Sequence, residues 1–150
     1  MAIGEFCNRE VVVVENNCTI LEAARLMRQH HVGSLVIVAA DADVNRPVGV
    51  ITDRDLVVEV MAGGLDPEAV LVGDVVNETL YSVRESADLF DALRLMRDHG
   101  VRRLPVVDVD GGLQGIFAVD DWVALLAEEM NELSRLIVHE QAKELSCRKN

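Results

Sequence analysis

The chain has 150 residues, of which half are hydrophobic, enough to bury one compact core or two small halves that share one. It carries 26 acidic against 14 basic residues, which gives a net charge of −12. This excess of acid argues against a general nucleic-acid binder and against binding to an anionic membrane surface, because both need basic groups. We therefore expect neither nucleic acid nor membrane among the partners.

The cysteines and the N-terminal residues indicate a cytoplasmic protein. Cys7, Cys18 and Cys147 are odd in number and form no C-x-x-C pair, so we expect neither a disulfide framework nor a zinc site. The N-terminal segment has no basic stretch followed by a long apolar run. The sequence therefore predicts no signal peptide and no transmembrane helix.

The first half of the chain predicts a strand, a helix, two strands and a second helix. Hydrophobic patterning places these elements, in chain order, at residues 11–14, 20–31, 34–40, 48–52 and 53–61. Thr19 followed by Glu22 is a capping-box pattern that predicts the start of the first helix. A turn-rich loop over 41–47 separates the two later strands, and Gly63 and Gly64 end the second helix.

The second half repeats this order. Residues 92–101 resemble residues 23–32 at an offset of 69, taken from Met27 and Met96. Strands are expected at 80–83, 103–107 and 114–118. A helix capped by Asp88 and ending near Gly100 precedes the second of these strands, and a last helix begins at about Asp120. A hairpin turn at 110–112 joins the last two strands. A repeat of this kind indicates two similar half-domains with sites in the cleft between them.

The last helix carries an apolar seam that its counterpart in the first copy lacks. Leu126, Met130, Leu133 and Ile137 alternate by four and three residues, as in a short coiled coil. This seam predicts a partner surface, either on a second chain or on the same chain folded back. A homodimer is the expected assembly.

The repeat and the element that ends its third strand resemble the CBS domain, named for cystathionine β-synthase. In the first copy this element is Thr52-x-x-Asp55, and two such units in tandem resemble a Bateman module, or CBS pair. The resemblance covers about residues 5–126. It implies an α/β (α+β) fold of two tandem β-α-β-β-α CBS motifs packed with pseudo-two-fold symmetry, plus an extended C-terminal helix. It divides the chain into motif 1, a connector, motif 2, and a C-terminal helix and tail, at 5–65, 66–77, 78–126 and 127–150.

Thr52 and Asp55 are the candidate ribose and phosphate contacts. A carboxylate can accept hydrogen bonds from both hydroxyls of a ribose, and Asp55 stands in the first turn of a helix, where its position is fixed. Thr52, just before that turn, can bond the sugar or a phosphate oxygen, and the helix N-terminus favours anions. The alternative is that Thr52 and Asp55 only cap the helix, since the same spacing forms a capping box.

The family resemblance implies further ligand contacts. An apolar slot for adenine would be formed by Val11, Val12, Val32, Gly33 and Ser34. Arg102 and Arg103 of the second copy stand at the positions of Gly33 and Ser34. The resemblance implies that they reach the phosphates of a ligand held by the first copy, and the forked donors of arginine suit phosphate. Arg54, inside the motif, is a further candidate. For the valines, core packing is the alternative; for the arginines, it is a solvated or salt-bridged surface pair.

The corresponding site of the second copy is degraded. Its expected residues are Leu80, Tyr81, Val101, Ala118 and Asp121. Ala118 stands where the resemblance expects Thr or Ser, so one hydroxyl contact is lost at a cost on the order of 1 kcal/mol. We therefore expect this second site to be weaker than the site of Thr52 and Asp55.

Three functions fit these residues. The first is a regulatory module that binds an adenosine ligand (AMP, ADP, ATP, NAD(H) or S-adenosylmethionine) as effector and passes a change of shape or assembly to a separate, unknown downstream protein. The second is a structural dimerisation module with vestigial sites. The third is a metal-dependent nucleotide hydrolase, although no catalytic residue set is visible. We adopt the first, and so expect no enzyme activity, no resident metal and no required cofactor.

Overall fold

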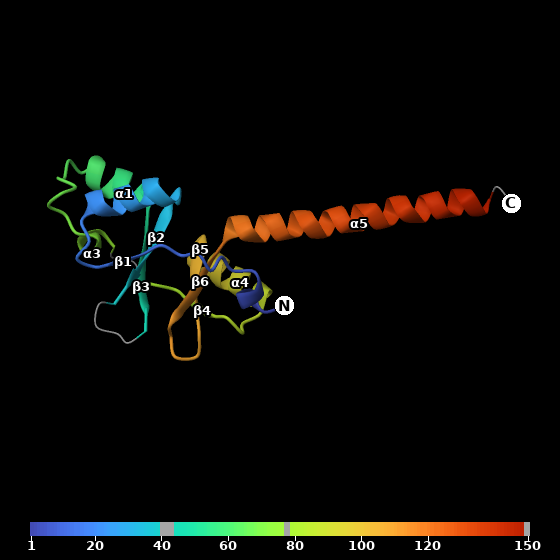
Figure 1. Ribbon diagram of the computed structural model, residues 1–150, viewed down its shortest axis with the longest axis horizontal. Helices are drawn as coiled ribbons and strands as arrows, with labels where there is room; N and C mark the ends of the chain where they lie inside the picture. Colours follow the sequence, from blue (N-terminus) through green and yellow to red (C-terminus); the bar gives the residue numbers. More distant parts are fainter. Residues whose placement is uncertain (40–43, 77–78, 149–150) are drawn as a thin grey trace. The chain divides into compact units, whose positions relative to one another are not determined.

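A computed structural model describes residues 1–39, 44–76 and 79–148 of the chain (Figure 1). The chain divides into two units, Met1–Phe117 and Ala118–Asn150. The first unit holds the strands of two three-stranded sheets, ordered β1-β2-β3 and β4-β5-β6. The second consists mainly of one long helix. Within the described residues, no helix is long and apolar enough to cross a membrane.

The first copy forms its sheet and its first helix largely as expected. Its elements are β1 (Val13–Glu15), α1 (Ile20–His30), β2 (Ser34–Val38) and β3 (Pro47–Thr52). β1 pairs with β2 in parallel, and β2 pairs with β3 in antiparallel fashion. The predicted capping box is present, because Thr19 Oγ1 accepts from the N–H of Glu22 at 3.2 Å and Glu22 Oε2 accepts from the N–H of Thr19 at 2.9 Å.

The second copy has the same element order. It contains β4 (Val83–Arg84), α4 (Leu89–His99), β5 (Arg103–Val107) and β6 (Leu113–Ala118). Asp88 caps α4 as predicted, since its Oδ1 accepts from the N–H of Phe90 at 2.9 Å. Gly111 adopts the left-handed φ of 84° that the predicted hairpin turn requires. The copies bury matching faces, because the residues of α1 and α4 that lie in the core are Ile20, Ala23, Met27 and Leu89, Ala92, Met96.

The segment ahead of each copy packs against the other copy. The N–H of Ile3 donates to the carbonyl of Ala87 at 2.9 Å, and the N–H of Val72 donates to the carbonyl of Cys18 at 2.8 Å. These two hydrogen bonds are related by the offset of 69 residues. The same offset relates the bond from Leu89 N–H to Met1 O with that from Ile20 N–H to Val70 O, both at 3.0 Å. The chain therefore exchanges equivalent segments between its two halves.

The exchanged segments belong to the core. Ile3 and Val72 are both fully buried, and Val72 is a member of the apolar cluster of the first copy. The glycine after each allows the close approach: a Cβ added to Gly4 would lie 2.9 Å from Cβ of Glu85, and one added to Gly73 would lie 3.1 Å from the carbonyl oxygen of Asn16. Part of the predicted connector 66–77 is thus packed structure, including α3 (Val72–Val75). The N-terminal 3-10 turn η1 (Ile3–Glu5) is its counterpart.

Strand boundaries differ from the prediction by a few residues. The strands expected at 11–14 and 80–83 are observed as β1 and β4, which begin at Val13 and at Val83. Partner strands set these limits, because Val13 is the first residue in register with β2 and Val83 the first in register with β5. β2 ends at Val38. Residue 40 of the expected strand, residues 41–43 of the expected loop and residue 77 of the expected connector lie outside the described part of the chain.

The helix expected over 53–61 is not a regular α-helix. It consists of a single α turn, α2 (Asp53–Asp55), followed by a π-helix, η2 (Leu56–Met61). The N–H of Ala62 donates to the carbonyl of Val57, five residues back, at 2.9 Å. Of η2 only Val60 is buried, while Val57 and Val58 are exposed. Packing of an apolar face therefore does little to favour a regular α-helix over the wider π-helix in this segment.

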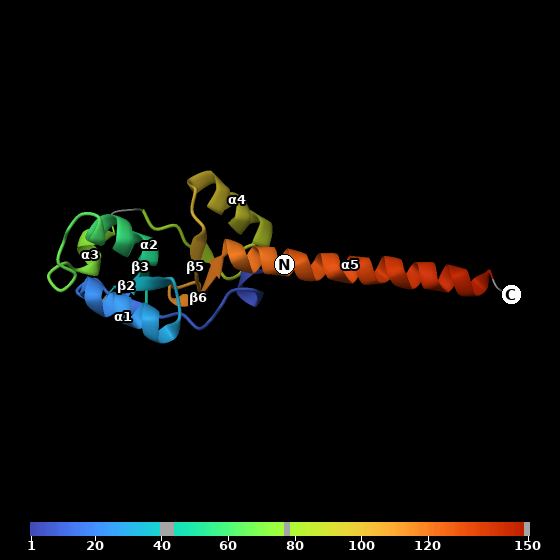
Figure 2. The same ribbon diagram turned by 90° about the horizontal axis from the view of Figure 1, so that it is seen from above.

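The second unit contains α5 (Val119–Cys147), a helix of 29 residues that begins close to the predicted Asp120. Figure 2 shows it as one continuous helix. Of the residues described in this helix, only Trp122 is buried, and all those from 131 onward are exposed.

The exchange of segments predicts that Gly73→Ala destabilises the fold. Its Cβ would meet backbone of the first copy, and overpacking of this kind costs typically 1–3 kcal/mol. Chemical denaturation should show a lower midpoint than the wild type. Glu68→Ala is the control, because Glu68 is exposed in the same connector and should change stability by less than about 0.5 kcal/mol. Equal midpoints for both variants would contradict the exchange.

Candidate functional site

One wall of the candidate site is the junction of β3 and α2. Thr52 ends β3 in an extended conformation and caps α2: its Oγ1 accepts from the N–H of Asp55 at 3.3 Å. Asp55 Oδ2 in turn accepts from the N–H of Thr52 at 2.8 Å. The capping box that the sequence left open as an alternative is therefore formed. It uses one carboxylate oxygen of Asp55, and it leaves the hydroxyl proton of Thr52 able to donate to a further acceptor.

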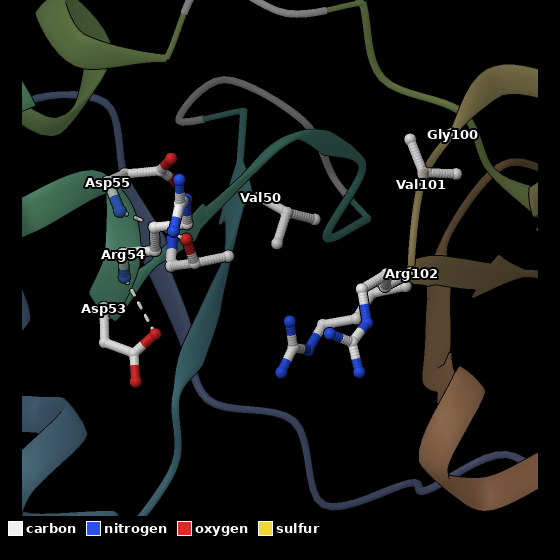
Figure 3. Close-up of a pocket in the computed structure, with 9 residues that line it drawn as sticks. Val50, Asp53, Arg54, Asp55, Gly100, Val101 and Arg102 are labelled. Atoms are coloured by element: carbon white, nitrogen blue, oxygen red, sulfur yellow. Dashed lines mark hydrogen bonds between the residues drawn. The ribbon is translucent and has the colours of Figure 1, made fainter. Parts of the chain in front are cut away.

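The opposite wall comes from the second copy. Gly100 ends α4 with a left-handed φ of 66°, and the chain then passes through Val101 and Arg102 into β5 at Arg103. These residues and the β3–α2 junction line one pocket of about 560 Å³, a volume suited to a small-molecule ligand. Figure 3 shows Asp53, Arg54 and Asp55 on one side, Gly100, Val101 and Arg102 on the other, and Val50 between them.

The pocket brings charged groups together from both copies. Arg54, Arg102 and Arg103 line it with Asp53 and Asp55, so cations outnumber carboxylates in a chain whose net charge is −12. The residues predicted for ribose and phosphate contact, Thr52 included, thus share one pocket although almost 50 residues separate them in sequence. A pocket with an excess of arginine suits an anionic group.

A smaller cavity of about 70 Å³ adjoins this pocket and shares Val50, Val101 and Arg103 with it. Leu80 and Tyr81, which were predicted for the second site, line this cavity. The ring of Tyr81 stacks on the ring of His99 at the end of α4, with centroids 3.8 Å apart and planes inclined by 18°. Sequence reasoning missed this pair, because no local spacing relates the two residues.

The residues predicted for the adenine slot are divided between two places. Val11, Val12 and Val32 line a different pocket, of about 710 Å³. Gly33 and Ser34 are closer to the Thr52 junction: the N–H of Asp53 donates to the carbonyl of Gly33 at 3.0 Å, and Ser34 pairs with Thr52 in the β2–β3 ladder. The pocket of Thr52 and Asp55 instead takes its apolar residues from Val50 and, in the second copy, Val101.

The equivalent turn of the second copy keeps half of the capping box. The N–H of Ala118 donates to Oδ2 of Asp121 at 2.7 Å, as Thr52 does to Asp55. The backbone of Ala118 (φ −111°, ψ 159°) nearly matches that of Thr52 (φ −115°, ψ 161°). The reciprocal bond is missing because alanine has no side-chain oxygen.

The Cys18 thiol is not activated as a nucleophile. Burial raises the pKa of the Cys18 thiol, and the Glu22 carboxylate adds to the increase, so the thiolate is disfavoured. Within residues 1–39, 44–76 and 79–148, no group of three or more His, Cys, Asp or Glu side chains is placed to hold a metal ion.

The half-formed box predicts opposite effects of two substitutions. Thr52→Val removes the cap acceptor and should cost about 1 kcal/mol of stability. Ala118→Thr supplies the missing acceptor. Its control is Ala118→Val, which has nearly the same shape but no hydroxyl oxygen. Thermal denaturation should show a higher melting temperature for Ala118→Thr than for Ala118→Val. Equal melting temperatures for the two variants at 118 would contradict the assignment.

Comparison with known proteins gives matches over both copies. The CBS-domain family model matches residues 3–62 and 72–128. The CBS domain-containing protein YhcV of Bacillus subtilis is 40% identical over 120 residues, which cover 80% of this chain and 81% of that protein. A CBS domain protein from Pyrobaculum aerophilum complexed with AMP has a TM-score of 0.73 and 28% identity, over 81% of this chain and 89% of that one. CBSX2 in complex with AMP has a TM-score of 0.69 and 28% identity, over 86% and 98% of the two chains. The chain therefore belongs to the CBS-domain family, with two CBS motifs in tandem.

Proposed function

We propose that this protein is a regulatory module that binds an adenine nucleotide in the 560 Å³ pocket between the two copies. The observation that carries the proposal is that Thr52 and Asp55 of the first copy share this pocket with Arg102 and Arg103 of the second. A ligand that touches both walls favours the arrangement in which both are in reach, and so shifts the population of that arrangement. The AMP complexes of two relatives support an adenosine ligand.

Asp55 is the proposed ribose contact. Its Oδ2 is occupied by the N–H of Thr52, and the other carboxylate oxygen has no hydrogen bond to the described part of the chain. This arrangement holds the side chain in one orientation before the ligand arrives, which lowers the cost of ordering it on binding. Capping and ligand binding are thus compatible roles of the same residue.

The phosphate contacts are assigned to arginines on both walls. Arg54 follows the cap on the first wall and Arg103 begins β5 on the second. No ion pair joins either guanidinium to a described carboxylate within 4.0 Å, so both remain able to form charge-assisted bonds with a phosphate. Thr52 can add its hydroxyl proton.

The base is assigned to the apolar end of the pocket. Val50 and Val101 lie at the boundary with the small cavity, and Leu80 and Tyr81 extend its lining. A flat aromatic base suits such a surface, and the phenol ring of Tyr81 can stack with it. We therefore assign the base to a surface formed by Val50 of the first copy and by Leu80, Tyr81 and Val101 of the second, instead of the slot expected at Val11, Val12 and Val32.

The output of the module is a change in conformation or assembly that a separate protein or a second copy detects. The ligand acts as effector, and its binding free energy favours one arrangement without any chemical step. A homo-oligomer is the assembly that we propose for this output.

Asp55→Asn tests the ribose assignment. The amide oxygen of asparagine can still accept from the N–H of Thr52, but it no longer offers two carboxylate oxygens to a ribose. In a thermal-shift screen with AMP, ADP and ATP, wild type should be stabilised by about 2.7 kcal/mol at 100 times the dissociation constant, and Asp55→Asn should lose most of the shift.

The matched control for that experiment is Asp74→Asn. Asp74 caps α3 through the N–H of Leu71 at 3.2 Å and does not line the pocket, so this variant should lower stability without changing the ligand-induced shift. If no nucleotide stabilises the wild type, or if Asp55→Asn responds like wild type, the ribose assignment fails. The structural module with vestigial sites would then become the better hypothesis.

Arg103→Ala tests the phosphate assignment. Titration calorimetry should show weaker nucleotide binding by roughly tenfold, as expected for a charge-assisted bond of about 1.5 kcal/mol. The affinity of wild type should fall with rising salt, and that dependence should be shallower in the variant. Arg25→Ala, on the exposed face of α1, should bind as wild type does. Unchanged affinity in Arg103→Ala would contradict the assignment.

A further inference from the structure

The helix α5 exposes more apolar side chain than a solvated helix normally carries. Leu126, Met130, Leu133 and Ile137 are 45%, 70%, 59% and 54% exposed. They follow one another at spacings of four, three and four residues, which places them on one narrow stripe of the helix. A contiguous apolar stripe of this kind marks an interaction surface.

Each described residue of α5 beyond 130 is exposed. Two side-chain bonds formed there, Arg135 to Glu132 at 2.9 Å and Ser146 to the carbonyl of Lys143 at 2.7 Å, are local to the helix. Local bonds of this type contribute only tenths of a kcal/mol, so a long helix gains most of its stability from packing. The stripe is where that packing can occur.

We propose that α5 forms an antiparallel pair with α5 of a second copy of this chain. In this alignment, positions whose numbers sum to 263 lie opposite one another. Leu126 then faces the partner's Ile137, and Met130 faces the partner's Leu133. The two-fold axis repeats both contacts, which gives four consecutive layers in which apolar side chains meet apolar side chains.

Charge selects this orientation over the parallel one. The seam continues with Glu140 and Glu144, which occupy the next two positions of the four-three spacing. A parallel pair would place each of these carboxylates against its own copy inside the seam, where like charges repel. In the antiparallel pair Glu140 faces the partner's Val123 at the end of the seam, near water, and the carboxylates stay apart.

The pairing is tested by the mass of the protein in solution. Leu133→Glu and Ile137→Glu place a charge in the seam, whereas Val138→Glu places the same charge one residue away, on a side chain that is 63% exposed and outside the stripe. Analytical ultracentrifugation of the full chain should show a smaller assembly for the two seam variants and an unchanged one for Val138→Glu. Circular dichroism should show that all three keep their helix content at high protein concentration.

A substitution that should strengthen the pairing controls for loss of assembly through misfolding. Glu140→Leu removes a carboxylate from the end of the seam and should lower the dissociation constant of the assembly by at least about fivefold. A monomeric wild type, or seam variants with the wild-type mass, would overturn the pairing and indicate that the stripe folds back on its own chain. These measurements need no nucleotide, so their failure leaves the ligand proposal unaffected.

The native Cys147 reports the orientation. It is exposed at the end of α5, so a parallel pair would bring the two copies of it together, while the antiparallel pair separates them by about 45 Å at 1.5 Å rise per residue. After mild oxidation, peptide mapping of the assembled protein should find no disulfide between two copies of Cys147. Such a disulfide in good yield would overturn the antiparallel arrangement.

Discussion

Each half of this protein is completed by a segment that belongs, in chain order, to the other half. Ile3 and Val72 are fully buried at equivalent places, and each donates its N–H to the carbonyl that precedes the helix cap of the opposite copy. A single copy expressed alone would lack the side chain that fills this core position, and the carbonyl before its helix cap would lose its hydrogen-bond donor. The exchange holds β3 of the first copy and β5 of the second in one folded unit, and that is the condition for a pocket lined by both.

The capping box at the head of α2 connects the fold with the ligand chemistry. Helix caps and anion sites both use the unpaired N–H groups of a first turn, so a Thr-x-x-Asp pattern alone does not distinguish them. Position supports the ligand role that we propose, because the box lines a pocket with three arginines, two of them from the other copy. The π-helix that follows buries only Val60, while the turn that carries Asp55 is held by the two bonds of the box and by the bond from Asp53 N–H to the carbonyl of Gly33.

The features that sequence predicted well are those with a local physical cause. The caps of α1 and α4 at Thr19 and Asp88, their buried faces and the long last helix all follow from spacing along one segment. Strand ends were misplaced because partner strands set them. The exchange has a sequence signal, since Ile3-Gly4-Glu5 and Val72-Gly73-Asp74 stand 69 residues apart, but these short segments carry no periodicity. Val11, Val12 and Val32 line a different pocket from Asp55, and the repeat alone does not show which residues of the two copies come to share a pocket.

The two copies have diverged in complementary directions. The first keeps the complete Thr52 and Asp55 box but has Gly33 and Ser34 where the second has Arg102 and Arg103; the second has the arginines but Ala118 in place of the threonine. Since the 560 Å³ pocket joins the box of one copy to the arginines of the other, both favourable features meet in that pocket. At the other equivalent positions, Ala118 lacks the threonine hydroxyl, and Gly33 and Ser34 carry no charge. The residues that we propose for ribose and phosphate contact therefore meet in one pocket, and the proposed module would respond to one bound nucleotide rather than to two.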